Sequence, residues 1–257
     1  MFIWRYFKMK VIYSETAKEL GVKAARETAR LLNQAIADKG YARMILSTGA
    51  SQFTTLEALI AEDVDWTKVE MFHLDEYIGI DETHPASFVK YLKERFVSKV
   101  NLKAVNFVDP SNGVDEIIAT LTEKLREAEV DVGLIGIGEN AHIAFNDPPA
   151  DFEDQNAYKV VVLAERCRQQ QLGEGWFATL ADVPEKAISM TVSQILRCRH
   201  IISAVPYAVK AQAIHDTLTS EITNMVPATI MKNHPSVQIF VDADSASMLP
   251  DSVQMVK

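Results

Sequence analysis

The segment GIGENAHIAFNDPP, residues 136–149, carries the residue types most suited to acid–base chemistry. His142 stands in its middle, with Asn140 before it and Asp147 after it. An imidazole titrates near physiological pH, so it can exchange protons with a substrate, and a carboxylate can orient its ring. We expect Asp147 to do so from five residues away. The alternative is a structural histidine bonded to a backbone carbonyl.

The same segment contains G-x-G-x-x-A after an apolar run, the spacing of a dinucleotide-binding fingerprint. That fingerprint opens a helix of ten or more residues, whereas Pro148 and Pro149 follow too soon for one. The pattern therefore disfavours a dinucleotide cofactor. We expect glycines such as Gly138 to let the backbone approach a bound ligand closely.

A second carboxylate site follows the apolar run VEMFHL and reads Asp75-Glu76-Tyr77. Asp75 is a candidate general base, because a crowded and partly dry site would raise its pKa. The alternative is a solvated loop start. His73 and Asp75 form a close His–carboxylate pair, but the six histidines show no H-x-x-x-H pattern, so a metal site is disfavoured.

Two further segments suit a phosphate group. The tetrapeptide Thr48-Gly49-Ala50-Ser51 lies between an expected strand and an expected helix, which Ser51 would cap. Glycine permits close backbone approach, and a helix N-terminus offers N–H donors and a positive dipole end. Lys210, early in another expected helix, could neutralise a phosphate. The alternatives are a plain capped turn and an ordinary surface lysine.

Short β-branched runs alternate with amphipathic helices along the chain, which predicts a three-layer α/β/α fold with a mostly parallel, Rossmann-like sheet. In such folds the ligand lies beyond the carboxyl ends of the strands, where all of these segments fall. Strands are expected at residues 10–13, 43–47, 69–74, 130–137, 158–163, 187–190, 200–205 and 237–241. Helices are expected at residues 15–38, 51–60, 86–97, 113–128 and 207–218.

Length, composition and charge limit the domain organisation and the partners of the protein. The chain has 257 residues, with 48% hydrophobic and 24% charged residues, which fits one globular domain over residues 9–257. We interpret residues 1–8 as a leader before a start near Met9. The net charge of −9 argues against nucleic acid or an anionic membrane as a partner. Two cysteines in no metal or redox spacing favour a reducing cytoplasm, and a homo-oligomer is left open.

Taken together, the motifs resemble the glucosamine-6-phosphate deaminase (isomerase) family from about residue 9 to 249. They are LSTGAS, FHLDEYIG, THPASF, GIGENAHIAFNDPP, ISMTVSQIL and the helix of Lys210. The resemblance implies conversion of glucosamine 6-phosphate and water to fructose 6-phosphate and ammonia, in amino-sugar catabolism. It implies a phosphorylated amino sugar as the ligand and no cofactor.

The resemblance also implies roles for individual residues. His142 would help to open the pyranose ring, and Asp75 would move a proton between C2 and C1. Asp147 would be the acidic partner of the histidine, where the best-known members have Glu. Asn140 and Ala141 stand where the family usually has Asp-Gly, which puts the efficiency of the reaction and the sugar in question.

The family's phosphate grip maps to the Thr48–Ser51 loop and Lys210, and Arg168 is the candidate for its phosphate-contacting arginine. Two other functions stay open. One is a lactonase on a phosphorylated sugar acid, which shares the fold but would not need Asp75. The other is a non-catalytic sugar-phosphate-binding module, although such modules usually carry a basic DNA-binding region and this chain is acidic.

Overall fold

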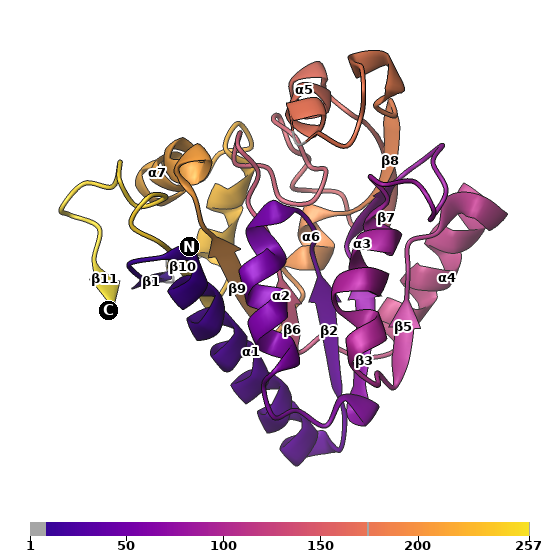
Figure 1. The fold of residues 1–257 in the computed structure, drawn as a ribbon, viewed down its shortest axis with the longest axis horizontal. Coiled ribbons are helices and arrows are strands. Elements are labelled where there is room, and N and C mark those ends of the chain that lie inside the picture. The colour runs from indigo at the N-terminus through magenta and orange to yellow at the C-terminus, as the bar shows by residue number, and fades with distance from the viewer. Residues whose placement is uncertain (1–8, 174, 257) are drawn as a thin grey trace, which may run out of the picture.

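A parallel β-sheet forms the centre of the molecule (Figure 1). The computed structural model describes residues 9–173 and 175–256, so the expected leader at residues 1–8 lies outside the described residues. The sheet has eight strands in the order β11-β1-β10-β9-β6-β2-β3-β5, and its pairings are parallel. The strands are β1 (Lys10–Tyr13), β2 (Ala42–Leu46), β3 (Val69–His73), β5 (Ala104–Asn106), β6 (Val132–Leu134), β9 (His200–Val205), β10 (Val237–Val241) and β11 (Met255–Val256).

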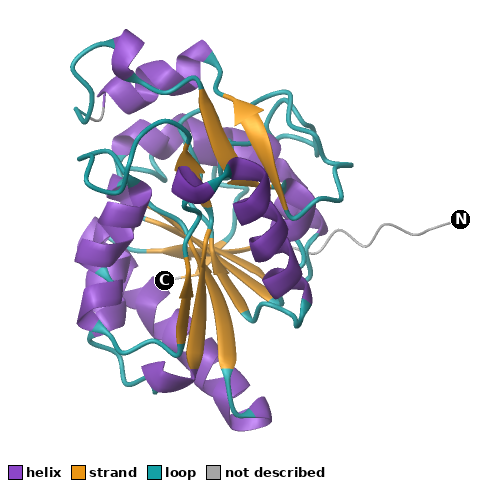
Figure 2. Ribbon diagram, turned by 90° about the vertical axis from the view of Figure 1, so that its right-hand side faces the viewer, coloured by secondary structure: helices purple, strands orange, loops and turns teal. Residues whose placement is uncertain are grey.

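Helices cover both faces of this sheet, which confirms the expected three-layer fold (Figure 2). Along β2, Met44 and Leu46 point into one apolar layer while Ile45 points into the other, because alternate strand residues face opposite sides. One layer packs against α1 (Ala17–Lys39), α2 (Phe53–Ile60) and α3 (Phe88–Arg95). The other packs against α4 (Val114–Arg126), α6 (Val192–Ile195) and α7 (Ala211–Thr219).

The longest helix, α1, begins and ends where the sequence predicts. The Thr16 side chain accepts a hydrogen bond from the Glu19 backbone N–H at 3.2 Å, and Gly40 ends the helix with φ of 84°. The Glu19 carboxylate accepts from the Glu15 backbone N–H rather than from that of Thr16, so Thr16 and Glu19 form only one half of a capping box. Short 3-10 turns are η1 (Ala50–Gln52), η2 (Trp66–Lys68), η3 (Val97–Lys99), η4 (Pro110–Asn112), η5 (Leu180–Asp182), η6 (Ala208–Lys210) and η7 (Pro227–Asn233).

A second, antiparallel sheet lies above the main one and was not expected. It consists of β4 (Asp75–Tyr77), β8 (Lys186–Met190) and β7 (Tyr158–Val162), followed in the chain by α5 (Glu165–Gly173). Strands β7 and β8 match expected strands. Residues Asp75–Tyr77 were expected to form a loop after a strand, but they form β4 and pair with β8. The expected strand at residues 130–137 is also shorter, because the chain leaves β6 after Leu134 to form the loop of the functional site.

No helix in the described part of the chain is both long enough and apolar enough to cross a membrane.

Candidate active site

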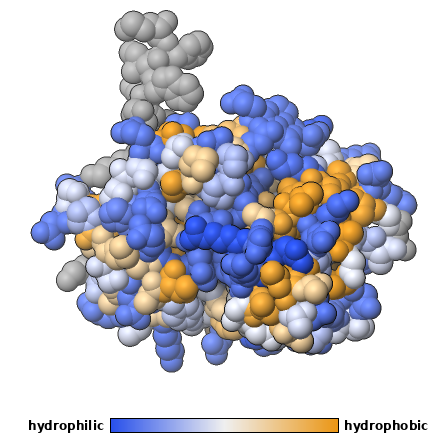
Figure 3. Space-filling model, turned by 90° about the horizontal axis from the view of Figure 1, so that it is seen from above, coloured by the Kyte–Doolittle hydropathy of each residue, from blue (hydrophilic) through white to orange (hydrophobic). Residues whose placement is uncertain are grey.

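A pocket of about 170 Å³ opens at the carboxyl ends of four neighbouring strands, β9, β6, β2 and β3. Each strand leads into one wall, so segments distant in sequence meet around one cavity, as the sequence predicts. Hydrophilic side chains fill the middle of this face of the molecule, beside an apolar area (Figure 3). The lining residues include Ser47, Thr48, Gly49, Ala50, Ser51, Asp75, Gly138, Glu139, His142, Gln170, Gln171, Tyr207 and Lys210.

His142 lies at the end of a chain of polar contacts. Its Nδ1 is 2.5 Å from Asn140 Oδ1, and the Asn140 amide N–H donates to Asp147 Oδ1 at 2.9 Å. Asp147 Oδ1 is also 3.3 Å from His142 Nδ1. An amide oxygen only accepts hydrogen bonds, so Nδ1 carries a proton and Nε2 is left for a ligand.

The carboxylate behind the histidine is held in its charged form. Burial alone would raise the pKa of Asp147, but hydrogen bonds from His142 and Asn140 and the charge of His142 outweigh burial and lower it. Neither Asn140 nor Asp147 lines the pocket, so both act on a ligand only through the ring of His142. The sequence predicted Asp147 as the orienting group, whereas the amide of Asn140 lies closer to the imidazole.

Gly138 makes room for this imidazole. A Cβ atom at position 138 would lie only 2.1 to 2.4 Å from three atoms of the His142 ring, so the ring packs directly on the glycine backbone. Gly138 also lines the pocket, so the expected close approach of its backbone to a ligand stays a prediction beside this contact with the histidine. Two residues of the same loop, Ala141 and Ala144, have positive φ angles of 62° and 50°, a conformation unusual for alanine.

Asp75 is buried, and its exposed fraction is only 6%. Burial raises the pKa of its carboxyl to about 8, and the neighbouring charge of Glu76 adds to the rise. Its side chain makes no hydrogen bond to any other described residue, so its oxygens are available to a ligand. A carboxyl with this pKa suits proton transfer near neutral pH.

Glu76, the next residue, has a structural role instead. Its carboxylate accepts hydrogen bonds from the Ser87 hydroxyl at 2.9 Å, the Val89 N–H at 2.8 Å and the Tyr77 N–H at 2.9 Å. These bonds tie β4 to the start of α3. The two adjacent carboxyls are thus separated by the alternation of the strand, which turns Asp75 to the pocket and Glu76 to the protein.

The Thr48–Ser51 loop lines the same pocket and is shaped by Gly49, whose φ is 98°. The expected cap by Ser51 is wrong, because α2 has Gln52 at its N-cap without a side-chain hydrogen bond. Ser51 Oγ instead accepts from the Gln52 amide at 3.0 Å, and the same amide donates to the Ala204 carbonyl at 3.1 Å. This bridge between the segment after β2 and strand β9 was not visible in the sequence, since its partners lie far apart along the chain.

Lys210 is nearly buried, with 9% exposure, at the end of a strained turn. Tyr207 begins this turn with φ of 81°, and its N–H donates to both carboxylate oxygens of Asp242 at 3.1 and 3.2 Å. Asp242, which follows β10, thereby fixes the path that leads to Lys210. A positive φ cannot be read from a tyrosine in a sequence, so this turn was missed.

Arg168 does not reach the pocket, which corrects its assignment as a phosphate ligand. Its guanidinium donates to the backbone carbonyls of Leu180 at 2.7 Å and Val183 at 3.0 Å. The side chains that α5 presents to the pocket are Gln170 and Gln171. Gln171 Oε1 accepts a hydrogen bond of 2.5 Å from the hydroxyl of the fully buried Tyr77.

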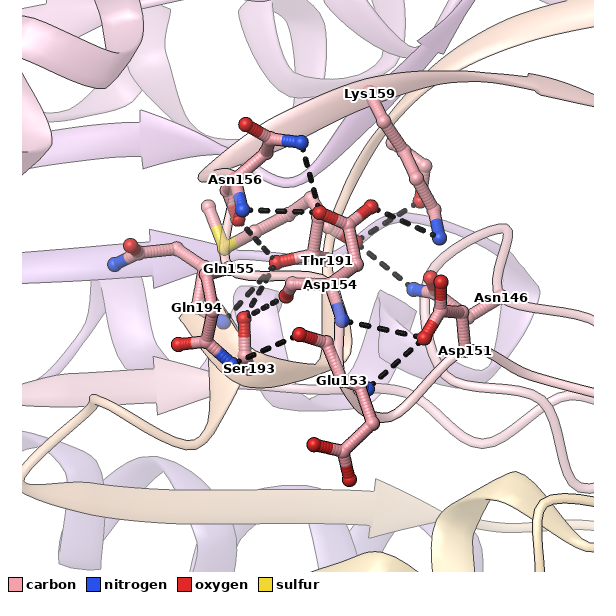
Figure 4. Close-up of polar contacts among 12 residues, drawn as sticks. Asn146, Asp151, Glu153, Asp154, Gln155, Asn156, Lys159, Thr191, Ser193 and Gln194 are labelled. Carbon is pink, nitrogen blue, oxygen red and sulfur yellow. Dashed lines mark hydrogen bonds and ion pairs between the residues drawn. The ribbon is translucent and has the colours of Figure 1, made fainter.

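The segment that leaves the histidine loop is fixed by side-chain contacts with backbone groups (Figure 4). The Asn146 amide donates to the Met190 carbonyl at 2.9 Å, and the Thr191 hydroxyl donates to the Asn156 carbonyl at 2.6 Å. Asp151 accepts from two backbone N–H groups of the turn that follows it. These bonds join the His142 loop to the end of β8 and the start of α6. The position of Asp147 is therefore fixed by contacts with a distant part of the chain as well as by its own segment.

No group of three or more His, Cys, Asp or Glu side chains suited to a metal ion occurs within residues 9–173 and 175–256. His73, weighed above as a metal ligand, is fully buried, and burial lowers its pKa to about 3. Its ring packs edge-on against Phe107.

The fold and the pocket define an α/β protein with a cavity at the carboxyl ends of a parallel sheet, lined by a buried carboxyl and a histidine. The sequence model of the family described as glucosamine-6-phosphate isomerases/6-phosphogluconolactonase matches residues 15–240. The chain therefore belongs to this family, whose described members are enzymes of phosphorylated sugars.

Similar proteins span nearly the whole chain. The glucosamine-6-phosphate deaminase of Thermoanaerobacter pseudethanolicus is 32% identical, over 95% of this chain and 96% of its own. Glucosamine-6-phosphate deaminase 1 of Bacillus subtilis is 31% identical, over 94% and 100%. Among solved structures, a monomeric glucosamine-6-phosphate deaminase has a TM-score of 0.84 at 28% identity, covering 93% of this chain and 100% of its own. The 6-phosphogluconolactonase of Trypanosoma brucei has a TM-score of 0.78 at 15% identity, covering 95% and 100%, which shows the shared fold alone.

Proposed function

We propose that the protein is a glucosamine-6-phosphate deaminase, which converts glucosamine 6-phosphate and water to fructose 6-phosphate and ammonia. The observation that carries the proposal is that one pocket holds two proton-transfer groups of different kinds. Asp75 is a buried carboxyl with a pKa of about 8, and His142 is an imidazole with only Nε2 left for a ligand. Whole-length similarity to proteins named as deaminases supports it.

His142 acts first in the proposed reaction. Nε2 accepts the proton of the C1 hydroxyl and returns a proton to the ring oxygen, so that the C1–O5 bond breaks and the open-chain aldehyde forms. The imidazolium that exists between these steps is stabilised by Asn140 and, behind it, by the carboxylate of Asp147. The Asn140 amide thus orients the ring, while the negative charge that stabilises the imidazolium comes from Asp147, which lies behind Asn140.

Asp75 acts next. Its carboxylate removes the proton from C2 of the open-chain sugar and delivers it to C1, while the aldehyde oxygen gains the proton that the amine at C2 gives up. The double bond thereby moves, C1 becomes an alcohol, and an iminium group is left at C2. Water adds to C2, and ammonia leaves as the ketone forms. The Thr48–Ser51 loop and Lys210 hold the phosphate, which takes no part in bond breaking. No step requires a cofactor.

The decisive experiment is an assay of the purified protein with glucosamine 6-phosphate, in which ammonia and fructose 6-phosphate are measured separately. Equal amounts of the two products are expected. A parallel assay with 6-phosphogluconolactone tests the lactonase alternative, since that hydrolysis releases acid and no ammonia. Binding of the amino sugar without either product would instead identify a sugar-phosphate-binding module.

A further inference from the structure

Glu139 contributes a second carboxyl group to the pocket that contains Asp75. It lies between Gly138 and Asn140, it is partly exposed, and it lines the same cavity as His142 and Asp75. Its side chain makes no hydrogen bond or ion pair to another described residue. Glu76 differs in this respect, because three donors of the protein already surround its carboxylate.

The charges around the cavity are unevenly distributed. Among the described residues that line the cavity, Lys210 is the one lysine or arginine, and Asp75 and Glu139 are the two acidic ones. A phosphorylated sugar brings a strongly negative group that Lys210 and the N–H donors of the Thr48–Ser51 loop attract and that Glu139 repels. A ligand therefore binds best when it offers Glu139 a positive group away from its phosphate.

We propose that Glu139 is a specificity residue that pairs with the ammonium group of an amino-sugar phosphate. The inference rests on the proposed function and names what selects the substrate at that site. The two proton-transfer residues act at C1 and C2, and the amine is carried by C2. Glu139 precedes His142 by three residues on the loop that presents the imidazole and lines the same cavity as His142 and Asp75, so the proposal assigns its carboxylate to the reacting end of the sugar.

The pairing distinguishes sugars of the same shape. An ammonium group donates charge-assisted hydrogen bonds to the carboxylate, whereas a hydroxyl in the same place offers one neutral hydrogen bond. A sugar acid phosphate would place a second carboxylate in a cavity that already contains Glu139. The carboxylate thus favours amino sugars and disfavours the sugar-acid product of a lactonase.

The test compares two open-chain analogues that differ only at C2, namely 2-amino-2-deoxyglucitol 6-phosphate and glucitol 6-phosphate. Calorimetry gives the Kd of each for the parent and for Glu139→Gln at pH 7. The parent is expected to bind the amine more tightly, and Glu139→Gln is expected to weaken amine binding about ten-fold, the scale of one charge-assisted hydrogen bond. Binding of the hydroxyl analogue should change less than two-fold, which also shows that the variant is folded.

Glu57→Gln is the matched control, because Glu57 is exposed on α2 outside the pocket and the change in net charge is the same. The proposal is overturned if Glu139→Gln weakens both analogues equally, leaves both unchanged or tightens both. The last result would place Glu139 beside the phosphate. Ammonia release by the parent is measured separately, so failure of the proposed reaction is distinguished from failure of the assignment of Glu139.

Discussion

At the scale of single residues, the site depends on two carboxyls whose surroundings have opposite effects. Asp75 lacks donors and is buried, so its pKa rises, whereas Asp147 is hydrogen-bonded to Asn140 and His142, so its pKa falls. One group is therefore ready to exchange a proton near neutral pH, and the other stays charged. The same residue type performs two tasks because the donors around it differ.

We predict that Asp75→Asn lowers kcat by roughly 10²–10⁴-fold, the usual contribution of a general base. The amide keeps the shape of the side chain and removes its basicity. In the parent, the base must be ionised, so kcat/KM should rise with pH up to about 8. Steady-state rates between pH 5 and 9 check both statements. A variant that keeps more than a tenth of the parent kcat would assign the proton transfer to another group.

Asn140→Asp is expected to lower kcat/KM at pH 7 by roughly ten-fold or more, a change of about 1.4 kcal/mol or more. The new carboxylate would lie against Asp147, with no N–H to replace the 2.9 Å hydrogen bond. Repulsion between the two would raise the pKa of one of them, so a shared proton should narrow the difference in kcat/KM between variant and parent at lower pH. The measurement is kcat/KM against pH for both proteins, and a clear gain in rate would show that a charge at position 140 is what the site lacks.

At the scale of elements, short irregular segments after the strands position the chemistry. The His142 loop and the Tyr207 turn both contain residues with positive φ, and both are held by partners from other strands. Strained backbone of this kind persists only when the surrounding structure fixes it. The rigid sheet thus holds the loops, and the loops hold the side chains.

Gly138→Ala should disable the site without unfolding the protein. The new methyl group would overlap the imidazole of His142, so the ring would have to move by about 1 Å, and a displacement of that size costs on the order of 100-fold in rate. Gly173→Ala is the control, since nothing lies within 4 Å of a Cβ there. Rates and melting temperatures of both variants are compared with those of the parent. Normal activity in Gly138→Ala would mean that the ring position is not critical.

Lys210→Ala should raise KM for the phosphorylated sugar about ten-fold and change kcat much less. The phosphate is held equally in the ground and transition states, so its loss affects binding rather than chemistry. A larger effect at low ionic strength is expected, because salt screens the charge interaction. Initial rates at two salt concentrations provide the test, and an unchanged KM would remove Lys210 from the phosphate site.

At the scale of the whole molecule, the site costs stability. A buried carboxyl with a folded-state pKa of about 8 and an unfolded value near 4 binds its proton more tightly in the folded protein. Its contribution to stability is fully present below about pH 4 and is lost as the pH rises towards 8. Buried histidines such as His73, whose pKa is lowered, act in the opposite direction below about pH 6.5.

The difference between parent and Asp75→Asn isolates the carboxyl. We predict that the variant is the more stable protein at pH 7 and that its advantage grows by up to about 1.4 kcal/mol per pH unit between pH 4 and 8. Urea unfolding at several pH values measures this difference. An advantage that does not change with pH would contradict the raised pKa of Asp75.

The sequence by itself determined the layered architecture and most of the site. Periodicity located β1, β2, β3, β9, β10 and the principal helices, because a sheet covered on both faces requires apolar runs separated by amphipathic helices. The position of chemistry-bearing residues just after strands placed Asp75, His142, Lys210 and the Thr48–Ser51 loop at one edge. That inference needs only the parallel direction of the strands.

Tertiary structure decided what depends on partners far apart in the chain. The antiparallel pairing of β4, β8 and β7, the Gln52 bridge and the turn held by Asp242 all join segments that no local pattern connects. The pairing of His142 with Asn140, the need for glycine at position 138 and the withdrawal of Arg168 from the pocket likewise follow from side-chain packing. A sequence gives the types of groups and their order, but distance and burial set their pKa values and partners, and these exist only in the folded chain.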